Sequence, residues 1–494
     1  MEHILYNAMI FKFVRDVINS GYNAAKIVIG YQSILVLVFG FLLPFSPLLL
    51  LLHALKTIES LIYTNYYNAC LLEKEDSLDS DDRIVLITVN GKILLPELKE
   101  LFIRNVLDSH TVDGDFSFPN VTKTLQCGWC NKYWLDEKCF NISDHIKMVG
   151  ETDEIYTIHD IPKLLNTVQK EPFENISGMK LSPWLINLAY VTENRTALIF
   201  KINQSLKDIE IIRALLSDSN YEVKTDAMKT IKKRENILSD YGYVNLFRNI
   251  GLSGWLMFRF ISQLPKRKRG SKDHKDEKRV YFCSKSMDTT IFQQIGYHTG
   301  VSARYVILSC VSMAIEENIS KTGTYCLSNF EFGAQSICQD SIALPAKLPS
   351  KPNKLDIKKY MQTLKQSISL DPAPCDVIFN TCLNRFAYIF IPVSLQSLLS
   401  SCHSFKIKVD LNSLDMEQYD HLVGNRIQSF SVWNEGFVSE HLRIIVTDSM
   451  NSVVVSTVSH YSKEDAALKF LKKFHMIRNQ IAKEMGVIEY IRPK

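Results

Sequence analysis

The sequence feature that most constrains the fold is a strand-turn-helix pattern between residues 196 and 216. Residues 196–202 form an apolar, β-rich run with Lys201 as its only charge. After a short polar turn, apolar residues recur at helical spacing, at Ile209, Ile212, Leu215 and Leu216. A buried strand followed directly by an amphipathic helix is typical of α/β domains. We therefore predict an α/β fold whose polar turn, which contains Asn203, Gln204 and Asp208, faces outward.

A second constraint is the apolar run at residues 27–52, which contains no charged residue. Such a run is long enough to cross a bilayer core of about 30 Å, and only a helix is favourable in lipid. The run starts too late and is too long for a signal peptide. We predict a transmembrane segment here, with residues 1–26 as an amphipathic lead-in. The alternative is a helix that bends at Pro44 and Pro47 and returns to the same side of the membrane.

The charges that flank this run bear on membrane topology. Lys12, Arg15 and Lys26 precede the run, and Lys56 is almost alone after it. The positive-inside rule then places the amino terminus in the cytosol and the rest of the chain across the membrane. Six N-x-S/T sequons agree with that orientation but carry little weight in a chain of this composition. A bent, monotopic anchor would instead keep the chain on one side.

The length of 494 residues suits a membrane anchor and two domains. We predict an anchor at 1–70, an acidic solvated linker at 71–82, a first domain at 83–264, a basic loop at 265–279 and a second domain at 280–494. The net charge of +4 implies no nucleic-acid partner. The eleven cysteines are scattered, which favours reduced thiols over a disulfide framework.

Cys127, Cys130, Cys139 and His145 raise the alternative of a zinc or redox site. The paired spacing of zinc motifs is absent, and a thioredoxin-type site needs the N-terminus of a helix directly after a strand. We therefore expect these residues to be structural and predict no metal.

Four segments follow one another in a recognisable order. They are Phe140–Ile146, the stretch from Ile161 through Phe173, Ser182-Pro-Trp184, and the strand-turn-helix. Together they resemble bacterial-type wax ester synthase/diacylglycerol acyltransferases, which carry H-H-x-x-x-D-G at the turn. Here the aligned residues are Asn203, Gln204 and Asp208, with Ile209 in place of the glycine.

The resemblance implies two chloramphenicol acetyltransferase-like, condensation-type α/β domains with a tunnel between them. It implies acyl-CoA as substrate without a further cofactor, and a fatty alcohol or diacylglycerol as acceptor. The second motif histidine is the general base in this family, and Asp208 is in a structural position. The lipid membrane, either endoplasmic reticulum or plasma membrane, is the expected location.

In the second half the resemblance continues in outline. The family's asparagine-aspartate pair at a helix start aligns with Ala303 and Arg304, and Asn384 begins a strand that ends at Pro392. With Trp184, these residues are predicted to bind substrate. His145, His159, His298 and His403 are alternative bases that nothing in the sequence places at the turn, and Gly-Tyr-His-Thr-Gly around His298 is typical of a helix end.

These observations support three alternative hypotheses about function. The first is acyl transfer, weakened because the amide of Gln204 cannot act as a base. The second is non-catalytic binding of acyl-CoA or lipid, and the third is a lumenal glycoprotein with no CoA contact. A serine hydrolase or a phosphate-loop enzyme has no support, because neither motif is present.

Overall fold

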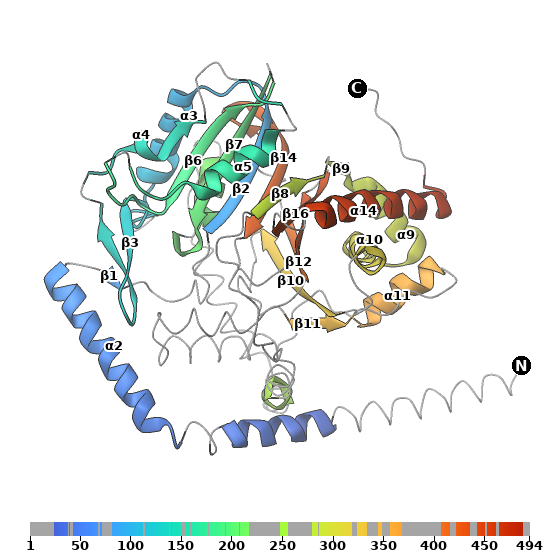
Figure 1. The fold of residues 1–494 in the computed structure, drawn as a ribbon, viewed down its shortest axis with the longest axis horizontal. Helices are drawn as coiled ribbons and strands as arrows, with labels where there is room; N and C mark the ends of the chain where they lie inside the picture. Colours follow the sequence, from blue (N-terminus) through green and yellow to red (C-terminus); the bar gives the residue numbers. More distant parts are fainter. Residues whose placement is uncertain are drawn as a thin grey trace, which may run out of the picture.

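The structure is a computed structural model (Figure 1). It describes residues 24–37, 39, 43–67, 70–71, 82–111, 114–137, 139–149, 155–157, 160–175, 177–192, 194–206, 208–216, 248–254, 279–284, 286–318, 324–332, 344–347, 356–367, 407–414, 421–434, 442–449, 452–460 and 464–487.

The first of two large sheets has the strand order β13-β14-β2-β7-β6-β5. Its strands are β2 (Asp82–Asn90), β5 (Ile146–Met148), β6 (Trp184–Tyr190), β7 (Arg195–Asn203), β13 (His421–Leu422) and β14 (Asn425–Asn434). The helices of this half are α3 (Leu95–Phe102), α4 (Ile142–His145), α5 (Ile161–Lys170) and α6 (Asp208–Leu216), and a π-helical turn at Ile103–Leu107 extends α3.

Both faces of the first sheet are buried, and β2 shows how its sequence achieves this. Val85, Ile87 and Val89 point into a core that contains residues of α3 and α6. Ile84 and Leu86 alternate with them and point into a different core on the opposite face. Because successive side chains of a strand face opposite sides, a continuous apolar run is what a strand covered on both faces requires.

The second sheet has the order β11-β10-β12-β15-β16-β8, with β9 paired to β16. Its strands are β8 (Arg279–Cys283), β9 (Met287–Asp288), β10 (Thr324–Phe332), β11 (Leu344–Lys347), β12 (Ile407–Leu414), β15 (Leu442–Ser449) and β16 (Ser452–His460). The hairpin of β15 and β16 confirms the sequence-based expectation for the last strands.

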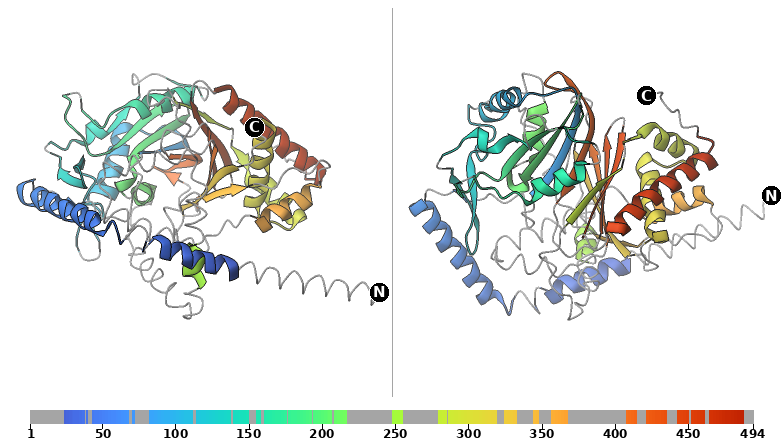
Figure 2. Two further views of the ribbon diagram at one scale, coloured as in Figure 1. Left: turned by 60° about the horizontal axis from the view of Figure 1, so that its bottom comes forward. Right: turned by 45° about the horizontal axis from the view of Figure 1, so that its top comes forward.

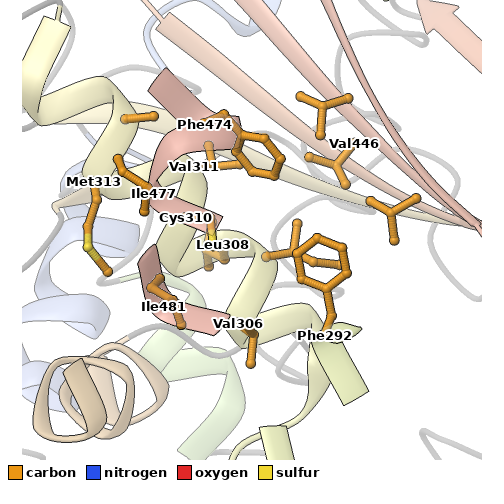
Figure 3. Close-up of a cluster of buried hydrophobic side chains, with 14 of the residues drawn as sticks. Phe292, Val306, Leu308, Cys310, Val311, Met313, Val446, Phe474, Ile477 and Ile481 are labelled. Atoms are coloured by element: carbon orange, nitrogen blue, oxygen red, sulfur yellow. The ribbon is translucent and has the colours of Figure 1, made fainter. Parts of the chain in front are cut away.

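Four helices cover the outer face of the second sheet (Figure 2). They are α9 (Thr289–Thr299), α10 (Ala303–Asn318), α11 (Ile357–Ser367) and α14 (Glu464–Glu484). Phe292, Val311 and Phe474 from three of these helices pack with Val446 of β15 (Figure 3). This cluster is the main hydrophobic core of the second half.

A third core joins the two halves. Trp433 of β14, Tyr281 of β8 and Ile445 of β15 pack with residues of β2, β7 and α5. The strand β14 belongs to the predicted second domain at 280–494, yet it pairs antiparallel with β2. That pairing covers the edge of β2 not occupied by β7, an edge that a strand buried on both faces cannot leave open. The sheets therefore do not follow the predicted division of the chain.

The apolar run near the amino terminus forms two helices. The first is Ala24–Leu37, the second is α2 (Ser46–Tyr67), and Leu43–Phe45 form a turn between them. The turn lies at Pro44, so the run has the bend that the sequence left open as an alternative to one straight helix over 27–52. In the described part of the chain, Ser46–Asn65 is the one helical segment long and apolar enough to cross a membrane.

A small three-stranded sheet lies beside the end of α2. It consists of β1 (Cys70–Leu71), β4 (Lys132–Asp136) and β3 (Lys123–Cys127), in that order. Most of the predicted linker at 71–82 lies outside the described residues, but its last residue, Asp82, is the first residue of β2.

Candidate functional site

The polar turn that the sequence singled out joins the end of β7 to the start of α6. Strand β7 ends at Asn203, a single 3-10 turn covers Gln204–Leu206, and α6 begins at Asp208. The predicted strand-turn-helix is therefore confirmed. We call residues 203–208 the motif turn. The side chains of Gln204, Asp208 and Ile209 lie outside the described part of the structure.

The expectation that the polar turn faces outward was wrong for Asn203, which is buried and holds the start of the motif turn in place. Its Nδ2 donates a hydrogen bond to Asp82 Oδ1 at 3.0 Å. Its Oδ1 accepts from the backbone N–H of Ser205 at 3.2 Å and from the Ser205 hydroxyl at 2.5 Å. A side-chain oxygen that accepts an N–H two residues ahead makes an Asx-turn. Asn203 therefore fixes the backbone conformation at the position of the first motif histidine.

Lys201 and Asp82 form a partly buried ion pair behind the motif turn. Lys201 Nζ lies 3.7 Å from Asp82 Oδ2 and donates to the carbonyl oxygens of Gln169 and Glu171 at 2.6 and 2.8 Å. The ammonium group also lies 4.8 Å from the ring centroid of Phe173. A buried charge needs such partners. The one lysine in the apolar run thus ties β7 to the end of α5 and to β2.

Trp184 and His145 lie in the core of the first half. Trp184 is 1% exposed, and its indole Nε1 donates to the carbonyl of Val121 at 2.8 Å. The His145 ring stacks on Trp184 at 4.3 Å between centroids, and His145 Nδ1 donates to the Trp184 carbonyl at 2.9 Å. His145 Nε2 lies 3.4 Å from Glu137 Oε2. These contacts are those of core residues, and the predicted contact of Trp184 with substrate stays a prediction.

Ala303 and Arg304 are the first residues of α10, so the predicted helix start is confirmed. The charge of Arg304 acts on Asp448 near the end of β15. Burial raises the pKa of Asp448 above its ordinary value, and Arg304 partly opposes that rise. The electrostatic link connects the helix start to the second sheet. Asn384 lies outside the described residues, so its role as a substrate contact stays a prediction, as does that of Ala303 and Arg304.

The alternative of a zinc or redox site finds no geometric support in the described residues. No group of three or more His, Cys, Asp and Glu side chains gathers there at metal-binding distance. Cys130 is buried, and Cys127 and Cys139 are exposed. Burial, and secondly Glu59, raise the pKa of Cys130 to about 11, which opposes thiolate chemistry. Of the other candidate bases, His298 is exposed in the last turn of α9, as expected of a helix end, and His159 and His403 lie outside the described residues.

Comparison with known proteins bears on the fold. No family model matches the chain, and no curated protein matches it. Among solved structures, it is similar to the first condensation domain of the calcium-dependent antibiotic synthetase in complex with a substrate analogue, with a TM-score of 0.52 at 10% identity over 82% of this chain and 92% of that one. The chain has a condensation-type α/β fold. This likeness confirms the two-domain α/β architecture that the sequence predicts. At 10% identity it bears on the fold and not on the function.

Two further structures resemble the chain at lower scores. The wax ester synthase/diacylglycerol acyltransferase from Marinobacter aquaeolei VT8 has a TM-score of 0.49 at 10% identity, covering 84% of this chain and 97% of that one. The condensation enzyme VibH has a TM-score of 0.45 at 8% identity, covering 87% of this chain and 96% of that one.

In this condensation-type fold, three strand ends meet at the motif turn. Asp82 at the start of β2 is opposite Asn203 at the end of β7 in the antiparallel register. On the other side of β2, Asn434 at the end of β14 is opposite Arg83. The motif turn therefore lies at the end of the first sheet where the strand from the second half also ends.

Sequence reasoning missed two residues that support the motif turn. Asp82 belongs to a run of acidic residues, which we interpreted as a solvated linker, but it bonds to Asn203 and pairs with Lys201. Ser205 was not singled out at all. The available signal was Lys201, because a lone charge inside an apolar strand requires a carboxylate or several carbonyls nearby.

Proposed function

We propose that this chain binds long-chain acyl-CoA at the motif turn, and that it transfers the acyl group to a fatty alcohol or diacylglycerol only slowly. The observation that carries the proposal is the motif turn itself. The turn joins strand to helix at the end of the first sheet and is fixed by Asn203, and Gln204 follows directly, at the position of the family's base.

The proposed weakness of transfer follows from the chemistry of an amide. In acyl transfer from a thioester, a neutral histidine removes the proton of the attacking hydroxyl, which requires a group with a pKa near 7. The amide of Gln204 does not accept a proton at ordinary pH, although it can orient a hydroxyl. Loss of a general base typically lowers the rate by about 10² to 10⁴. What is left is positioning of the two substrates.

A non-catalytic acyl-CoA-binding protein is the second candidate, and the contacts of Asp82 favour it. Asp82 is the carboxylate that the structure places beside the motif turn. One of its oxygens accepts a hydrogen bond from Asn203, and the other faces Lys201. A carboxylate engaged in this way is a poor substitute for the missing base.

We further propose that the acceptor or the bound lipid comes from a membrane with which the amino-terminal helices associate. Fatty alcohols and diacylglycerol reside in membranes, and the segment Ser46–Asn65 is apolar enough to enter one. The endoplasmic reticulum and the plasma membrane are both compatible with this proposal.

The test of binding is thermal unfolding of the purified full chain with palmitoyl-CoA below its micelle concentration. A ligand that binds only the folded state stabilises it by about 2.7 kcal/mol at 100 times its Kd. We expect palmitoyl-CoA to raise the Tm, and free CoA or palmitate to raise it less. Gln204→Trp, which fills the motif turn, should lose the shift, whereas the exposed Thr167→Trp on α5 should keep it. No shift with the wild type, or the same shift with both variants, would contradict binding at the motif turn.

A further inference from the structure

We propose that the two amino-terminal helices enter one leaflet of a lipid bilayer and return, so that neither crosses it. We call Ala24–Leu37 and α2 the anchor helices. The inference rests on the membrane association proposed above and specifies how the helices lie in the membrane. It does not depend on acyl-CoA binding.

The anchor helices and the turn between them present large apolar side chains to the surroundings. Val36, Phe39 and Leu50 are 64% to 70% exposed. The other exposed apolar residues of this stretch are Val28, Leu35, Leu43, Phe45, Leu48, Leu51, Leu55, Ile58, Leu61 and Ile62. Contiguous apolar surfaces of this kind mark protein or membrane contacts. Because no charged residue occurs at 27–52, we assign the part of this surface within that run to lipid.

The second half of α2 is bound to the small sheet through Glu59 and Tyr63, and we call these contacts the clamp. The Glu59 carboxylate accepts hydrogen bonds from the backbone N–H groups of Trp129, Cys130 and Asn131, at 2.6, 2.8 and 3.1 Å. One helical turn later, Tyr63 stacks on Tyr133 with 4.1 Å between ring centroids. These contacts place the loop between β3 and β4 directly beside the middle of α2.

This clamp is incompatible with α2 as a transmembrane span. A helix rises about 1.5 Å per residue, so Glu59 lies about 20 Å from Ser46, within a core of about 30 Å. A spanning α2 would therefore draw the loop at 128–131 and the adjoining strands into hydrocarbon. In the described residues, β1 and β3 are the outer strands of that sheet and each pairs only with β4. Open sheet edges are not tolerated in lipid.

The other anchor helix, Ala24–Leu37, packs closely against a further helical segment at residues 248–254. A Cβ at Gly254 would lie 2.4 Å from the carbonyl oxygen of Gly30, and a Cβ at Gly251 would lie 2.8 Å from Ile27 Cγ2. The helical segment 248–254 thus crosses Ala24–Leu37 in close contact, and both views show the two together beneath the sheets (Figure 2).

The bend between the helices is the part that reaches deepest. Leu43 and Phe45, in the turn, are 54% and 44% exposed. Trp129, beside Glu59, is 52% exposed, and tryptophan is enriched at the headgroup level of membranes. We therefore place residues 39–55 in the acyl region and Trp129 at the boundary.

Protease digestion of sealed microsomes that contain the full chain with an epitope tag at each end tests whether one of the helices alone crosses the bilayer. We expect external protease to remove both tags without detergent. Protection of one tag alone would show a crossing and would overturn the proposal. Protection of both tags would support the one-leaflet geometry on the lumenal side, while contradicting the use of cytosolic acyl-CoA.

Vesicle flotation tests the lipid contact separately. Leu50→Asp with Leu51→Asp should lower the fraction bound to phosphatidylcholine vesicles at least tenfold, because charges are costly in the acyl region. Thr363→Asp with Gln366→Asp adds the same charge to exposed positions of α11 and should bind as the wild type does. Circular dichroism checks that both variants are folded. Unchanged flotation of the Leu50/Leu51 variant would contradict the assigned surface.

Discussion

Asn203 Nδ2 donates a hydrogen bond to Asp82 Oδ1 at 3.0 Å, which joins the last residue of β7 to the first residue of β2. The same carboxylate faces Lys201. A single aspartate thus supports both the Asx-turn at Asn203 and the buried ammonium group. This arrangement holds the start of the motif turn against the first sheet.

Asp82→Ala should lower the free energy of unfolding by about 1–3 kcal/mol, because it leaves Asn203 Nδ2 and Lys201 Nζ without their carboxylate. Denaturant unfolding of the detergent-solubilised chain measures this. Asp136→Ala, which removes an exposed carboxylate at the end of β4, is the control and should cost little. Equal stability of the two variants would show that the Asp82 contacts do not hold the motif turn.

Trp433→Ala should cost about 3–5 kcal/mol, because the indole is completely buried in the core that joins the two halves. The variant should also unfold in separated transitions if that core couples the two sheets. Trp129→Ala removes an exposed indole and should change the stability in detergent by less than about 0.5 kcal/mol. Calorimetry gives both results. A single unshifted transition for Trp433→Ala would contradict a shared core.

Cys130 should alkylate far more slowly than Cys127 at pH 8. Its pKa of about 11, raised by burial and then by Glu59, lowers the thiolate fraction about 100-fold relative to a thiol at 9.0. Mass spectrometry of peptides after timed alkylation measures the two rates. In Glu59→Gln the burial stays but the carboxylate charge is lost, so the pKa should fall and the rate rise. Identical pH profiles for both cysteines would contradict the clamp.

The same raised pKa has a consequence for stability. Between about pH 9 and pH 11 the unfolded chain loses the Cys130 proton, while the folded chain keeps it. This thiol therefore makes the folded state less stable as the pH rises through that window. Glu59→Gln should narrow the window from its upper end.

The local parts of the fold were predictable from sequence. The apolar, β-rich run at 196–202 and the helical period after Asp208 located the strand, the turn and the helix to within a residue. The resemblance to the acyltransferase family gave the two-domain fold. These signals are local, or they depend on motifs in a fixed order.

What the sequence did not reveal depends on contacts between distant segments. Asp82 and Asn203 are 121 positions apart, and Glu59 and Trp129 are 70 apart. No periodicity in either segment points to its partner. For the same reason, nothing local indicates that β14 leaves its own half to pair with β2. For the apolar run at 27–52, the composition gave its length and the two prolines raised a bend as an alternative, but only the structure shows that the run turns at Pro44.

We have proposed that the motif turn is an acyl-transfer site without the family's base. The most direct test of this proposal is ester formation from labelled palmitoyl-CoA and a mixture of fatty alcohol and diacylglycerol, by the wild type, Gln204→His and Gln204→Ala. We expect the wild type and Gln204→Ala to be near background, and Gln204→His to be faster by about 10² or more. Robust ester formation by the wild type that Gln204→Ala leaves intact would contradict the claim.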